Sequence, residues 1–89
     1  MRRKEVSTKA LKYALDEAKS ELSRRLGQKG YGGFVSSHEM YGVLMEEVNE
    51  LSEALHDNDQ DQFESELKDI IVAALFSIAS LYDNTHNGW

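Results

Sequence analysis

Apolar residues recur at steps of three and four along three stretches of the chain, which is the spacing of an amphipathic α-helix. The first stretch predicts a helix over about residues 6–26, and its apolar series is Leu11, Ala14, Leu15, Ala18, Leu22 and Leu26. Gly27 directly follows this series, so we expect the helix to stop there. Four glycines lie within residues 27–35, which predicts a non-helical connection.

The second stretch predicts a helix over residues 37–57. Ser36 and Glu39 have the spacing of a capping box, in which each side chain binds an unpaired amide of the first helical turn. The apolar face of this helix is formed by Tyr41, Leu44, Met45, Val48, Leu51 and Leu55. Residues 56–59 predict a turn, in which Asn58 or Asp59 caps the helix that follows.

The third stretch predicts a helix over residues 60–82. Its wide apolar face is formed by Phe63, Leu67, Ile70, Ile71, Ala74, Leu75, Ile78 and Leu81. The short link between the second and third helices makes them antiparallel neighbours. The sequence therefore predicts a single all-α domain over residues 1–89, consisting of an antiparallel helical hairpin and an additional N-terminal helix.

The size of the chain affects how this domain is stabilised. It has 89 residues and no cysteine, so disulfides and thiolate metal sites are excluded. A domain this small buries only about 60–65% of the surface of its unfolded chain and needs further support. We expect that support to come from metal binding and from a homo-oligomer, a dimer or tetramer, that completes a four-helix-bundle-like core.

Charge is distributed unevenly along the chain. Residues 1–29 carry nine Lys or Arg and four Asp or Glu, whereas residues 30–89 carry one Lys and twelve Asp or Glu. The basic N-terminal part offsets the acidic remainder, and no recognition motif accompanies it, so a nucleic-acid partner is not expected. No apolar run approaches the roughly 20 residues of a membrane span. A cytoplasmic protein is the resulting expectation.

Four carboxylates have a spacing that predicts a common site. Glu47 and Glu50 lie on one narrow stripe of the second helix, and Glu66 and Asp69 are surface neighbours on the third. Either pair alone is typical of a solvated helix face. Closing the hairpin, however, turns the two stripes toward each other, and four converging carboxylates would resist ionisation. A divalent cation relieves this repulsion, and an all-oxygen ligand set favours Mg²⁺, with Mn²⁺ as an alternative.

Two sequence runs carry a family resemblance. The runs EEVNEL at residues 46–51 and ELKD at residues 66–69 resemble the Glu-Glu-x-x-Glu and Glu-x-x-Asp signature of the MazG-like all-α nucleoside triphosphate pyrophosphatases. The resemblance covers roughly residues 38–82. It implies four catalytic residues that also bind the metal, namely Glu47, Glu50, Glu66 and Asp69, with Glu46 as a supporting acid.

The resemblance also implies a reaction. It is Mg²⁺-dependent hydrolysis of a (deoxy)nucleoside triphosphate to the monophosphate and pyrophosphate, in a role of nucleotide-pool housekeeping. The residues that could contact the substrate phosphates are Lys68, His38, Arg25 and Lys29. An alternative is a non-catalytic helical oligomer that binds metal or nucleotide and acts through interaction or regulation.

Overall fold

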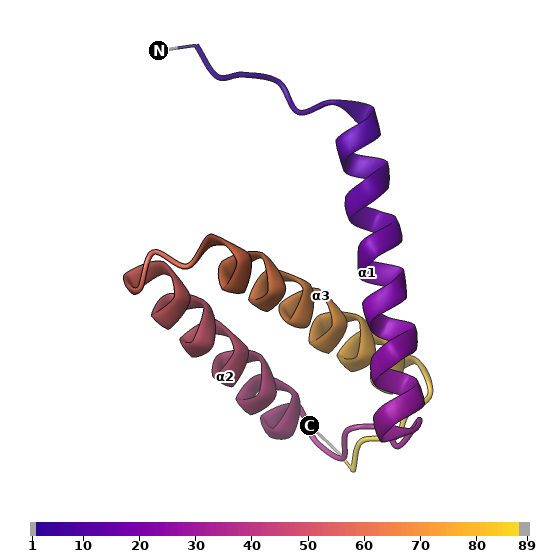
Figure 1. Ribbon diagram of the computed structural model, residues 1–89. Helices are drawn as coiled ribbons and strands as arrows, with labels where there is room; N and C mark the ends of the chain where they lie inside the picture. The colour runs from indigo at the N-terminus through magenta and orange to yellow at the C-terminus, as the bar shows by residue number, and fades with distance from the viewer. Residues whose placement is uncertain (1, 88–89) are drawn as a thin grey trace.

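The computed structural model describes residues 2–87 and contains three helices: α1 (Thr8–Lys29), α2 (Ser37–His56) and α3 (Gln60–Tyr82). Helices α2 and α3 form the antiparallel hairpin, and α1 runs across α3 (Figure 1). The N-terminal half of α1 projects away from the hairpin (Figure 1). The all-α class, the hairpin and the additional N-terminal helix are thereby confirmed.

The end of α1 differs from the expectation. Gly27 lies inside the helix, which continues to Lys29, so the predicted stop at Gly27 is wrong. Gly30 ends the helix instead, with a φ of 80° and an N–H that donates to the carbonyl of Leu26 at 2.8 Å. A glycine inside a helix costs only about 1 kcal/mol, so Gly27 does not stop the helix. Gly30 can adopt a positive φ at little cost, and the helix ends where the backbone takes this conformation.

The starts of α2 and α3 agree with the capping signals. The Ser36 hydroxyl accepts a hydrogen bond from the Glu39 amide at 3.1 Å, and the Glu39 carboxylate accepts one from the Val35 amide at 2.9 Å. The acidic side chain thus reaches one residue further back than in the usual capping box. Asp59 caps α3, while Asn58 takes a left-handed conformation with a φ of 55°.

The glycine-rich connection is held by the segment after α3. The Phe34 amide donates to the Ser80 hydroxyl at 3.1 Å, and the Thr85 hydroxyl donates to the Phe34 carbonyl at 2.8 Å. A Cβ on Gly33 would lie 2.6 Å from the Cβ of Thr85. Gly33 therefore permits a close approach of two segments that lie far apart in the sequence.

The core of the three helices is small. The buried apolar residues are Ala18, Met40, Ala54, Val72 and Ala73, and no large side chain among residues 2–87 is fully buried. The radius of gyration is 15.0 Å, compared with about 12 Å expected for a compact chain of this length. No helix within the described residues is long and apolar enough to cross a membrane.

An apolar surface remains exposed on the hairpin. On α2 it comprises Tyr41, Met45, Val48 and Leu55, and on α3 it comprises Leu67, Ile71, Leu75, Ile78 and Tyr82. We call these nine residues the hairpin apolar face. A single chain leaves this face in contact with water, so the expectation of a homo-oligomer stays a prediction.

Candidate metal centre

The hairpin brings acidic side chains of α2 and α3 together. One carboxylate oxygen from each of Glu47, Glu66 and Asp69 lies within 4.8 Å of the other two. Glu50, one turn from Glu47, lies at the edge of this group, where the close approach of the Glu66 carboxyl group raises the pKa of the Glu50 carboxyl. The two acidic stripes that helical periodicity placed on separate helices therefore face each other. We call these four residues the acidic cluster.

Burial distinguishes the cluster from an ordinary acidic surface. Glu66 is only 4% exposed, and its Oε1 accepts a hydrogen bond from the side-chain Nε2 of Gln62 at 2.6 Å. The Oε2 atoms of Glu66 and Glu47 are buried and have no hydrogen-bond partner among the residues that the structure describes. A buried polar atom without a partner costs free energy, so this arrangement calls for a donor or a cation.

The pKa values show the cost of gathering these charges. Burial, followed by the close approach of the Glu66 carboxyl group and the charges of Asp69 and Glu50, raises the pKa of Glu47 from 4.5 to about 7. Burial also raises the pKa of Asp69, although the neighbouring Arg25 opposes that rise. Near neutral pH, the cluster without a cation therefore holds part of a proton that isolated carboxyls would release.

Two basic residues predicted to contact phosphate have different surroundings. Arg25 of α1 reaches the cluster, with its Nη1 3.6 Å from Oδ1 of Asp69. Lys68 instead forms ion pairs with Glu64 at 3.2 Å and with Glu17 of α1 at 3.7 Å. Lys68 therefore links α1 to α3 through acids that lie outside the cluster.

The remaining predicted site residues are not part of the acidic cluster. Glu46 is solvent-exposed on α2. His38 is exposed in the first turn of α2, nine residues before Glu47, which corresponds to about 13 Å along the helix axis. Lys29 and Arg25 both line the cavity that is described in the next paragraph. Sequence reasoning missed Gln62, although its position four residues before Glu66 on one helix was the available signal.

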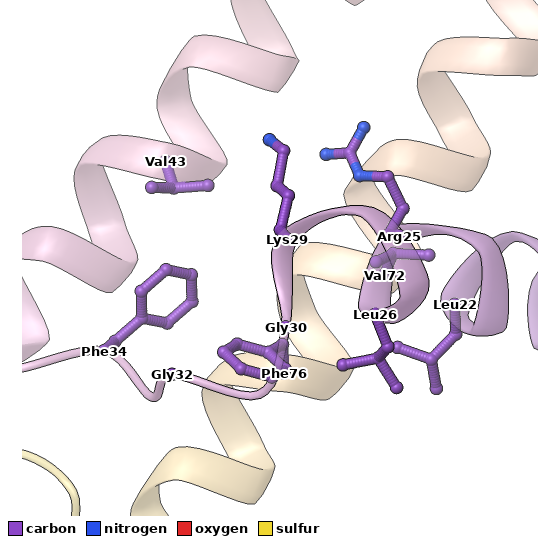
Figure 2. A pocket seen from close by; sticks show the side chains of 10 residues that line it. All are labelled: Leu22, Arg25, Leu26, Lys29, Gly30, Gly32, Phe34, Val43, Val72 and Phe76. Carbon is purple, nitrogen blue, oxygen red and sulfur yellow. The ribbon is translucent and has the colours of Figure 1, made fainter.

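A cavity of about 210 Å³ lies beside the cluster, between the end of α1, the glycine-rich connection and the hairpin (Figure 2). Val43, one turn before Glu47 on α2, and Val72, one turn after Asp69 on α3, both line it. The cavity and the acidic cluster are therefore adjacent along both helices.

Comparison with known proteins identifies the family. The family model of the MazG nucleotide pyrophosphohydrolase domain matches residues 35–86, which include all of α2 and α3 but not α1. No curated protein and no solved structure matches the chain. The matched region spans more than half of the 89 residues and contains the whole acidic cluster. The chain belongs to the MazG nucleotide pyrophosphohydrolase domain family.

Proposed function

We propose that this protein is a Mg²⁺-dependent nucleoside triphosphate pyrophosphohydrolase, which cleaves (deoxy)nucleoside triphosphates to monophosphates and pyrophosphate. The observation that carries this proposal is the convergence of Glu47, Glu66 and Asp69 within 4.8 Å, where buried oxygens of Glu47 and Glu66 lack donors within residues 2–87. Family membership supplies the class of reaction.

The acidic cluster fits a hard divalent cation. All of its side chains offer carboxylate oxygens, which are the ligands that Mg²⁺ and Mn²⁺ prefer. Glu47, Glu66 and Asp69 would hold the ion, and Glu50 would complete the set from the edge. When bound, the ion would polarise the phosphoryl oxygens and offset the negative charge of the triphosphate.

The other groups of the site have separate roles in this proposal. The hydrogen bond from Gln62 fixes the orientation of the Glu66 carboxylate. Arg25, next to Asp69, adds a positive charge on the side from which a phosphate would approach. Glu50 is the most exposed carboxylate of the cluster, so among the four it is the one most accessible to substrate and solvent.

The proposal includes a homo-oligomer. The hairpin apolar face consists of two antiparallel helices, and two such faces related by a two-fold axis would form a four-helix bundle. This arrangement would bury the apolar surface that a single chain leaves exposed. It would leave α1, which runs across α3, free to approach the acidic cluster of its own chain.

Pyrophosphate release from a panel of canonical and modified nucleoside triphosphates tests the activity. With Mg²⁺ present, we expect Glu66→Gln to lower kcat/KM by at least about 100-fold, because one ligand oxygen of a buried set loses its charge. Glu64→Gln is the matched control, since Glu64 lies on the same helix and is 71% exposed. It should retain activity within about twofold.

Two results would count against the hydrolase. One is equal turnover by Glu66→Gln and the wild type, which would separate activity from the cluster. The other is an absence of turnover on any nucleotide by folded protein that binds Mn²⁺. The second result would favour the non-catalytic, metal- or nucleotide-binding alternative.

A further inference from the structure

The cavity beside the acidic cluster has walls of two kinds. Most of its lining is apolar, and the two aromatic residues Phe34 and Phe76 pack edge to face, with ring centroids 5.4 Å apart and planes at 90°. Its charged lining residues are Arg25 and Lys29, whose side chains extend side by side in the same direction (Figure 2). The cavity therefore combines an apolar floor with a cationic side.

Such a cavity suits one end of an amphipathic ligand. Aromatic and aliphatic walls favour a flat, largely apolar ring, whereas paired cations favour the anionic group attached to that ring. Val43 and Val72 lie about one helical turn from Glu47 and Asp69, respectively. A ligand whose ring lies between the two valines would therefore direct its anionic part along Arg25 toward the cluster.

The lining also indicates how the ring is recognised. Apart from Arg25 and Lys29, the side chains that line the cavity are aliphatic or aromatic, and the remaining lining residues are glycines. A site with buried hydrogen-bonding groups can prefer the correct ring over a wrong one by about 10⁴–10⁵-fold, because the wrong ring leaves those groups unpaired. A pocket that contacts the ring only through apolar groups reaches a preference of only about 10–200-fold.

We infer that this cavity binds the nucleobase of the substrate and accepts it by shape and apolar contact, so that the protein discriminates only weakly among the four bases. The identity of the ligand rests on the proposed function, whereas the location of the pocket rests on the geometry alone. α1 supplies a wall of this pocket through Leu22, Arg25, Leu26 and Lys29. Since α1 lies outside the matched residues 35–86, this wall of the pocket comes from a segment that the family match does not include.

The test measures binding without turnover. Adenosine, guanosine, cytidine and uridine 5′-monophosphates are titrated into isotope-labelled protein, and chemical-shift changes are followed by NMR. Val43→Phe fills the cavity from α2. Gly32→Leu fills it from the connection, where an added Cβ meets no atom within 4 Å. Val6→Phe, at an exposed position before α1, is the matched control.

We expect the four monophosphates to shift the Phe34, Val43 and Phe76 signals and to bind within about tenfold of one another. Each filling variant should weaken this binding at least tenfold and leave Mn²⁺ affinity within about threefold, while Val6→Phe changes neither. Shifts confined to other residues, or unchanged binding by both filling variants, would overturn the pocket. Binding of one base more than 100-fold tighter than the others would overturn the mode of recognition. Because turnover is not the readout, nucleotide binding by an inactive protein would support the pocket while refuting the hydrolase.

Discussion

Glu47→Gln should stabilise the metal-free protein. The rise in the pKa of Glu47 from 4.5 to about 7 corresponds to ~3 kcal/mol of cost to the ionised side chain in the folded state. Because the side chain is only half-buried, solvent screening reduces this to about 1–2 kcal/mol. Glutamine retains the shape without the charge. At about 4–8 °C per kcal/mol, the expected rise in Tm is roughly 4–16 °C at pH 7.5.

The sign of the pH dependence follows from the direction of the pKa change. Between pH 4.5 and about 7 the folded protein binds more protons at Glu47 than the unfolded chain, so the free energy of unfolding falls as pH rises through this window. Below pH 4.5 the carboxyl is protonated in both states and the cost disappears. The stabilisation by Glu47→Gln should therefore be largest above pH 7 and vanish near pH 4.

Thermal unfolding followed by circular dichroism, at fixed protein concentration with chelator, measures this difference between pH 4 and 8. Adding Mn²⁺ at ten times its Kd should stabilise the wild type by about 1.4 kcal/mol and the variant much less. Glu46→Gln, the exposed neighbour on α2, is the control and should change stability by less than about 0.5 kcal/mol. A lower Tm for Glu47→Gln at pH 7.5, or an equal rise for Glu46→Gln, would refute the reasoning.

Three further predictions concern the surroundings of the site. Gly33→Ala should cost about 1–3 kcal/mol in thermal unfolding because its Cβ would collide with the segment after α3, whereas Gly32→Ala meets no atom within 4 Å and should cost less than about 0.5 kcal/mol. Arg25→Gln removes the cation that pairs with Asp69, so a Mn²⁺ titration should show severalfold tighter binding while KM for nucleotide rises; weaker Mn²⁺ binding would contradict this role. Ile71→Glu places a charge in the hairpin apolar face and should reduce the mass measured by light scattering to that of one chain; an unchanged oligomer would exclude this face as the interface.

Local patterns account for the parts of the structure that were predicted correctly. The period of 3.6 residues identifies the apolar faces, and the same period places Glu47 with Glu50 and Glu66 with Asp69. The short link at residues 57–59 then leaves little freedom in how the two helices pair, so the convergence of the acids follows from the sequence. The position at which a helix ends is harder to predict from sequence. Gly27 and Gly30 are both residues at which α1 could end, and only the backbone conformation distinguishes them.

Contacts between distant segments could not be predicted. The crossing of α1 over α3 pairs Arg25 with Asp69 and Lys68 with Glu17, and no spacing within either helix encodes that crossing. The hydrogen bond from Thr85 to Phe34 joins residues 51 positions apart. The cavity depends on both features, since the crossing supplies one wall and the held connection supplies Phe34. This explains why sequence analysis located the acidic cluster but missed the adjacent pocket.

The burial of Glu66 is informative because this small domain has little stability with which to offset a buried acid. A domain with few buried apolar side chains has little free energy to offset an acid that is 4% exposed and has an oxygen without a partner in the described part of the chain. Replacing such an acid with a neutral side chain would be expected to improve stability. The cluster is therefore best explained by a ligand that binds only the folded state, since binding adds stability by mass action. Under the proposed function, a divalent cation would complete the fold at the inner side of the hairpin, and a second chain would complete it at the hairpin apolar face.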